Sequence, residues 1–229
     1  MRFIMLIFVT LLVFGAITLN CHRYAYALPS YLGPSGLILI PDGQATHFQS
    51  FSFSAHFFNL SGSLRRFGID GSGNSFAVNY SPVPALEVGV SSLKTQASDR
   101  ANMLNGKVII IPESELQPFA LAAGVVDALD EQEISPYVLV SKNLKLSGPT
   151  AKNQVSLLLN AGYGGGFYDD GFIAGGEIKI TPQFSLLAEG SKRYINFGGR
   201  FTSQGLALDI GFIDAQDLAG GISYSFFWD

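Results

Sequence analysis

The chain has 229 residues, a formal net charge of −4, only 14% charged residues, 26 glycines and a single cysteine. So acidic and cation-poor a chain lacks the basic face of a nucleic-acid-binding protein, and no nucleic-acid partner is expected. One cysteine excludes both a disulfide framework and a metal site built from several cysteines.

Residues 1–27 resemble a secretory signal peptide. Arg2 precedes a long apolar run, and an Ala-Tyr-Ala sequence that fits a cleavage site ends at Ala27. The mature chain is therefore expected to begin at Leu28. Loss of the leader removes the only cysteine and changes the formal net charge to about −6. The alternative is an uncleaved membrane anchor, because the apolar run is long for a signal and Arg23 is unusual so near the cut.

The rest of the chain divides into a short N-terminal part and one β domain. Residues 28–47 are interpreted as a periplasmic segment with a short strand at Gly36–Ile40, ended by Pro41. Residues 48–229 show period-two alternation, which predicts β-strands. Twelve strands are expected, at Phe48–Phe58, Ser75–Ser81, Leu86–Lys94, Asn102–Ile111, Phe119–Val126, Ser135–Ser141, Val155–Tyr163, Phe172–Thr181, Phe184–Ser191, Ile195–Phe201, Leu206–Phe212 and Leu218–Trp228.

The connectors between these strands suggest two different rims. Odd-numbered connectors are mostly long or rich in glycine and aspartate, whereas four of the five even-numbered connectors contain proline and most are short. Short turns on one side and longer loops on the other are typical of outer-membrane barrels, and an even strand count puts both termini on the periplasmic side. The last run alternates up to Trp228, which resembles the closing strand of such barrels.

The two faces of the strands differ in a way that favours a membrane barrel. Charge is confined to one face, and that face is otherwise mostly serine, glycine, asparagine and alanine; the other face is apolar. Lipid outside and a polar lumen inside explain both faces. A soluble sandwich with an apolar interior is the alternative. Ser135–Ser141 does not resolve into two such faces, because Tyr137 and Leu139 lie opposite Val138 and Val140.

The charged residues of the inward face are predicted to form a polar network that fills and braces the lumen. A three-residue turn at Pro182–Phe184 would place Glu177 opposite Glu189, with Lys179 as the neighbouring cation. A substrate or cation site is the functional alternative. The predicted network consists of Glu87, Lys107, Glu177, Lys179, Glu189, Arg200 and Asp209.

No motif indicates catalysis, a metal or a cofactor. After the leader the chain has only His47 and His56, with no further ligands grouped at zinc spacing. Gly162–Phe167 lacks the ending of a phosphate loop and is expected to be a flexible surface loop. A glycosidase pair of Glu177 and Glu189 is conceivable, but nothing else marks a cleft. The chain is therefore not expected to be an enzyme.

Several stretches resemble the YjbH-like outer-membrane proteins. These are "GPSGLILIPDGQ", "NYSPVPALEVGVS", "FALAAGVVD", "PYVLVSKNLK" and "GGEIKITPQFSLLAEG". The resemblance implies a β-barrel of the outer membrane associated with exopolysaccharide production or export, with lipid and a polysaccharide or an export assembly as partners. Larger members of the family are several hundred residues longer. A passive narrow pore or a structural outer-membrane protein is the alternative function, and a barrel-embedded enzyme is a third.

Overall fold

The structure is a computed structural model that describes residues 28–44, 48–60, 71–96, 98–146 and 155–227. The predicted signal peptide lies outside the described residues and stays a prediction. The twelve strands are β1 (Ser50–Leu60), β2 (Gly71–Val83), β3 (Leu86–Thr95), β4 (Ala101–Ile111), β5 (Ala120–Val126), β6 (Ser135–Lys145), β7 (Ser156–Gly164), β8 (Gly171–Lys179), β9 (Phe184–Ser191), β10 (Ile195–Ser203), β11 (Leu206–Ile213) and β12 (Asp217–Phe227).

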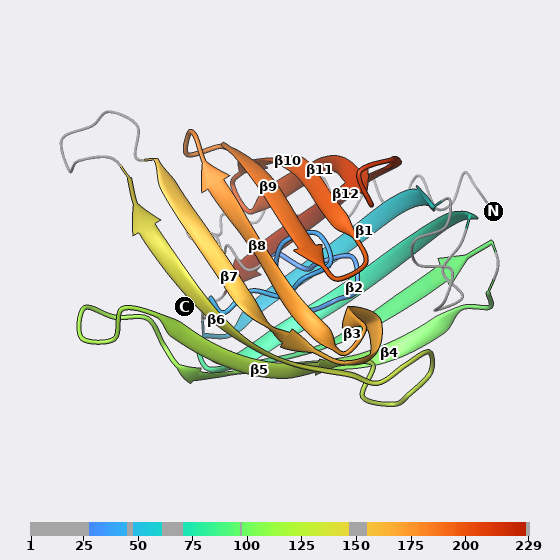
Figure 1. The fold of residues 1–229 in the computed structure, drawn as a ribbon, viewed down its shortest axis with the longest axis horizontal. Helices are drawn as coiled ribbons and strands as arrows, with labels where there is room; N and C mark the ends of the chain where they lie inside the picture. The colour runs from blue at the N-terminus through green and yellow to red at the C-terminus, as the bar shows by residue number, and fades with distance from the viewer. Residues whose placement is uncertain (1–27, 45–47, 61–70, 97, 147–154, 228–229) are drawn as a thin grey trace.

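The strands form one closed antiparallel barrel (Figure 1). Each strand pairs with the next along the chain, and β12 closes the barrel on β1 with Ser50 opposite Phe227. The predicted twelve-stranded antiparallel barrel is thus confirmed. In the described part of the chain the single 3₁₀ turn is η2 (Gly166–Tyr168), and no helix is long and apolar enough to cross a bilayer.

The connectors fall on two rims, but they differ less in length than the sequence suggested. We call the rim where β1 begins and β12 ends the terminal rim, and the opposite one the far rim. The terminal rim has two-residue turns at 84–85 and 204–205, yet it also carries 112–119 and 146–155. These two are as long as most connectors of the far rim, so loop length alone does not orient the barrel.

The strands have an inward polar face and an outward apolar face. On β1, Ser52, Ser54 and His56 are buried, while Phe53 and Phe57 are 42% and 56% exposed. β6 follows the same alternation with apolar side chains on both faces: Tyr137 and Leu139 are buried inside the barrel. The partners of these inward apolar residues come from outside the strands.

Candidate functional site: the lumen and the plug segment

Residues 28–44, which we call the plug segment, lie inside the barrel (Figure 1). Nearly every residue from Leu28 to Pro41 is buried, including Leu37 and Ile40 at 1% exposure. The sequence analysis interprets residues 28–47 as a periplasmic segment, which stays a prediction; in the structure residues 28–44 pack against the inward faces of the strands. The reason is chemical complementarity between its backbone and the charges of the wall.

The plug segment is irregular rather than a strand. Its β pairing is limited to two isolated bridges, Pro29 with Ser35 and Gly36 with Pro41, and the Tyr31 amide also donates to the Ile38 carbonyl at 2.8 Å. Proline lacks the amide proton that a strand ladder needs, and residues 37–40 form a bend. The short strand expected at Gly36–Ile40 is therefore wrong. The Leu37 amide donates to the Ile40 carbonyl within the bend. The amides of Ile38, Leu39 and Ile40 must find acceptors on the wall, because a buried amide without a partner is costly.

Glu189 on β9 supplies those acceptors. Its carboxylate receives hydrogen bonds from the amides of Ile38, Leu39 and Ile40 at 3.0, 2.7 and 3.1 Å. The side-chain amide of Asn196 donates a fourth, at 2.7 Å. Several donors on one carboxylate offset the cost of its burial. Glu189 thus binds the backbone of the plug segment rather than a cation.

Lys107 and Glu87 hold the middle of the plug segment from β4 and β3. They are directly opposite cross-strand partners, and the Lys107 Nζ lies 3.8 Å from a Glu87 oxygen and 3.3 Å from Asp42 Oδ1. Glu87 accepts the Ser35 amide at 2.8 Å, and Lys107 donates to the Ser35 hydroxyl. Burial raises the pKa of the Asp42 carboxyl above its ordinary value, although the Lys107 cation acts in the opposite direction.

Arg200 on β10 joins the third group of charges. Its Nε lies 2.7 Å from Asp209, its cross-strand partner, and its Nη1 lies 3.7 Å from Glu177. The guanidinium also donates to the carbonyls of Gly36 and Leu37 at 3.3 and 3.1 Å. One side chain therefore balances two carboxylates and binds the same bend whose amides Glu189 receives.

The predicted pairing of Glu177 with Glu189 is wrong. Glu177 lies opposite Leu187, and Glu189 lies opposite Gly175. The turn is longer than expected: the Ile180 amide bonds the Phe184 carbonyl, and the Thr181 hydroxyl accepts the Phe184 amide. This shift separates the two carboxylates.

The other members of the predicted network follow from that register. Glu177 accepts a hydrogen bond from Ser185 at 2.6 Å and lies near Arg200. Lys179 lies opposite Ser185, at the terminal-rim end of β8.

Neutral inward residues complete the contacts and were not singled out by sequence reasoning. Asn79 donates to the Gly33 carbonyl at 2.8 Å and Ser91 donates to the Leu32 carbonyl at 2.8 Å. The Gly43 amide donates to Ser141 at 2.8 Å. Asparagine and serine on an inward face were interpreted only as small polar side chains; a lumen-filling segment gives them specific roles.

Apolar packing fixes the other side of the plug segment. Tyr31 stacks on His56 with ring centroids 4.0 Å apart and an interplanar angle of 23°. Leu39 and Ile40 belong to one buried cluster with the inward Tyr137 and Leu139 of β6. This cluster explains why β6 carries apolar residues on both faces.

The far-rim side of the lumen is also filled. Tyr168 of η2 is fully buried, and its ring meets Tyr137 edge-on at 6.1 Å. The Phe167 amide donates to Ser135 at 2.9 Å. The expectation of a flexible surface loop at Gly162–Phe167 is therefore wrong, because its strand residues continue β7 and Phe167 packs inward.

The described residues contain no arrangement that matches a catalytic or metal site. His56 Nδ1 lies 3.4 Å from the Ser75 hydroxyl, and no carboxylate contacts its ring within the described ranges. No group of three or more His, Cys, Asp or Glu residues there is placed to hold a metal ion. The chemistry that the lumen supports is binding of polypeptide backbone.

Comparison with known proteins finds only remote likenesses. No protein-family model and no curated protein matches the chain. Among solved structures, it is similar to a KdgM porin in complex with disordered oligogalacturonate, with a TM-score of 0.47, 8% identity, and coverage of 79% of this chain and 99% of the porin. It is also similar to the outer membrane protein Omp33 of Acinetobacter baumannii, with a TM-score of 0.46, 12% identity, and coverage of 82% and 100%. Likenesses this remote carry no argument about the fold or the function of this chain.

Proposed function

We propose that the protein is a non-enzymatic β-barrel of the outer membrane whose lumen is closed by its own plug segment. The observation that carries the location is the outward face, where large apolar side chains are exposed on strands around the barrel. Val90, Ile110, Leu159, Ile195 and Ile210, for example, are 43–65% exposed. Water would make such a surface costly, whereas lipid requires it.

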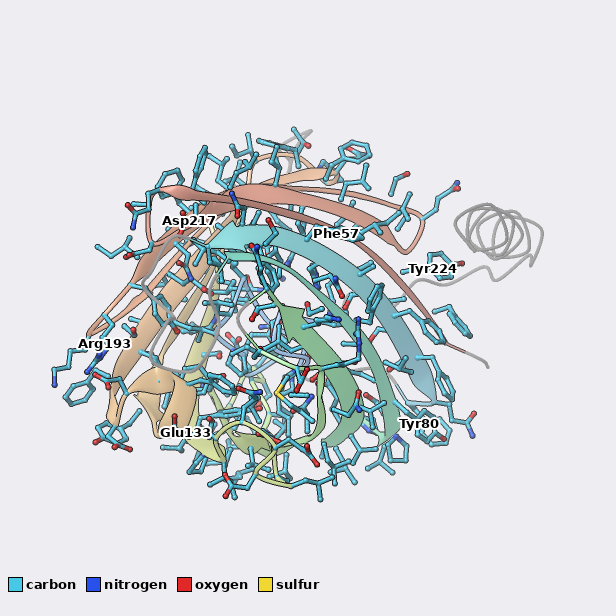
Figure 2. All side chains as sticks on the ribbon, turned by 90° about the vertical axis from the view of Figure 1, so that its right-hand side faces the viewer. Phe57, Tyr80, Glu133, Arg193, Asp217 and Tyr224 are labelled. Carbon is cyan, nitrogen blue, oxygen red and sulfur yellow. The ribbon has the colours of Figure 1, made fainter. Side chains whose placement is uncertain are left out.

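An aromatic group on the outside near the terminal rim supports the same location. Phe51 of β1 packs against Tyr80 of β2 at 4.4 Å and against Phe226 of β12 at 5.9 Å. Tyr224 adds a second ring with a hydroxyl (Figure 2). Rings with polar tips gather at membrane–water interfaces. We therefore assign this rim to an interface, and to the periplasmic one if the termini face the periplasm.

Two simple measurements test the membrane location. Extraction of the full chain should require detergent, and unboiled protein should migrate differently from boiled protein on a denaturing gel, because a closed barrel resists the detergent until heated. Recovery as a soluble monomer without detergent would contradict the proposal.

The closed lumen supports a structural or anchoring role rather than free diffusion. The association with exopolysaccharide production or export rests on the resemblance to YjbH-like proteins. Deletion of the gene should then lower the amount of secreted polysaccharide while the permeability of the envelope stays normal. Unchanged polysaccharide in the deletion strain would remove that part of the proposal.

A narrow pore is the second candidate. The observation in its favour is the polar wall around the plug segment, whose bonds to Glu87, Glu189 and Arg200 could be exchanged for water. In this case the barrel would conduct only while the plug segment is displaced. Single-channel recording separates the two candidates: a structural barrel shows no ionic current, and a gated pore shows openings.

A further inference from the structure

The outward face of β1–β4 changes character near the far rim. On β8, β10, β11 and β12 the outward positions stay apolar up to that rim, with Phe172, Ile195, Phe212 and Leu218 all exposed. On β1–β4 the corresponding positions are polar. We call this surface the outward rim patch; it comprises Asn59, Ser72, Asn74, Ser92, Lys94, Arg100 and Asn102.

Arg100 is held in place by the neutral members of the patch. Its Nη1 donates to the Ser92 hydroxyl at 2.9 Å and its Nη2 donates to Asn74 at 3.3 Å. Ser92 in turn donates to Asn102 at 2.9 Å. The guanidinium carbon lies 5.8 Å from the centre of the Phe76 ring, the next outward residue toward the apolar band. The cation is therefore ordered at the boundary between apolar and polar surface.

Lys94 adds a second positive charge at the same place. It is the cross-strand partner of Asn74, which Arg100 also contacts. No carboxylate in the described part of the chain forms an ion pair with Lys94 or Arg100; Asp99 is exposed in the same connector and bonds neither. The other outward lysine of the described strands, Lys142, pairs with Glu113 at 2.9 Å. Within the described residues, the two cations of the patch are therefore held by neutral partners or by none, rather than by carboxylates.

We infer that the outward rim patch binds the phosphate-bearing headgroup of a lipid in the outer leaflet. The inference rests on the proposed membrane location and on an orientation with the termini in the periplasm. Phosphate oxygens accept hydrogen bonds from guanidinium and ammonium groups, and Arg100 is already oriented by neutral partners. Phe76, Val78 and Val90 lie below the patch and are exposed. A lipid docked there places its phosphates at the two cations and its acyl chains along these apolar residues.

The experiment compares lipid retention by the full chain and two variants. The protein is reconstituted in bilayers that contain lipid A with two phosphates and zwitterionic phosphatidylcholine, extracted gently, and its retained lipid is measured by native mass spectrometry. The double variant Lys94→Gln with Arg100→Gln should lower retention of the phosphorylated lipid roughly 10- to 30-fold. Each cation near an anionic membrane surface strengthens binding roughly fivefold, and the variant removes two cations. Lys145→Gln, an exposed lysine of the terminal rim, should leave it unchanged.

The outcomes separate this inference from the proposed function. If the unmodified chain and both variants insert, migrate in a heat-dependent way and retain equal amounts of lipid A, this result contradicts lipid binding by the outward rim patch and leaves the membrane location standing. Displacement of the lipid by millimolar inorganic phosphate would show a free-phosphate site and also contradict lipid binding by the patch. Failure of the chain to insert into bilayers contradicts both the membrane location and lipid binding by the patch.

Discussion

At the scale of single residues, the inward charges bind the plug segment as much as they bind one another. The alternation of the sequence predicted that Glu87, Lys107, Glu189 and Arg200 share a face, and their burial is consistent with that. It could not predict their partners. Many of those partners are backbone groups of residues 35–40, which belong to a segment without alternation. The cross-strand neighbours depend on the hairpin register, which is set by turn geometry.

Glu189→Gln should loosen the bend of the plug segment. The carboxamide keeps one acceptor oxygen and turns an NH₂ group toward amides that need an acceptor. Loss of charge-assisted hydrogen bonds of this kind costs about 1.5–3 kcal/mol. We expect the amides of Ile38, Leu39 and Ile40 to exchange with deuterium at least about tenfold faster. Glu115→Gln, on an exposed connector, is the control; equal protection in both variants would contradict the role of Glu189.

Gly33→Ala should disturb the docking of the plug segment at the turn that contains Gly33. Gly33 has φ of +125°, and an added Cβ would overlap the side chains of Asn105 and Ser91. Strained backbone of this kind costs about 1–3 kcal/mol before the overlap is counted. Gly106→Ala is the matched control, since a Cβ there meets nothing within 4 Å. The thermal unfolding temperature in detergent should fall for the first variant and hold for the second.

At the scale of elements, the strands followed from local pattern and the plug segment did not. Period-two alternation placed all twelve strands, with β9 predicted at its observed bounds. β2 begins at Gly71, four residues before the predicted start, because its pairing with β1 continues to Leu60. The plug segment has an apolar run between prolines, which resembles a short strand. Only the neighbouring wall decides that it bends instead, and no local pattern carries that information.

Leu159→Arg should test whether the outward face of β7 contacts lipid. Leu159 lies at the middle of this strand and is 43% exposed. An arginine near the bilayer midplane should lower the free energy of unfolding by about 2–4 kcal/mol. Leu159→Val keeps the surface apolar and should be mild. Urea titration of the folded barrel in lipid vesicles measures both; similar midpoints for the two variants would argue against lipid at this face.

At the scale of the whole molecule, the barrel and its plug segment form one buried unit. In an unfilled lumen, water would replace the plug segment as the partner of Glu87, Glu189 and Arg200, and it would also contact the apolar side chains of Tyr137 and Leu139. The plug segment provides both kinds of contact. Its amides and carbonyls bind the charged side chains, and its residues Tyr31, Leu39 and Ile40 pack against the apolar ones. Lys107 lies near Glu87, Arg200 lies near Asp209 and Glu177, and Glu189 accepts the backbone amides of the plug segment instead of pairing with a cation.

The conductance of the barrel should depend on how firmly the plug segment is docked. The full chain in a planar bilayer should stay closed. The combined variant Glu189→Gln with Gly33→Ala should show brief openings, because it weakens the bend and the turn at Gly33 together. Cysteines at Gly43 and Ser141 supply the control in that background. A Cβ at Gly43 would lie 2.9 Å from the Ser141 Cβ, so a shift of about 1 Å permits a disulfide.

The engineered disulfide should abolish those openings, and reductant should restore them, since the chain has no cysteine after Cys21 to compete. Openings that persist in the oxidised form would mean that ions pass by another route than the one residues 28–44 occupy. Equal conductance by the unmodified chain would mean that the plug segment does not close the barrel at all. If the weakened variant inserts normally but shows no conductance, a purely structural barrel is favoured. The lumen would then stay filled even after the plug segment has lost two of its contacts with the wall.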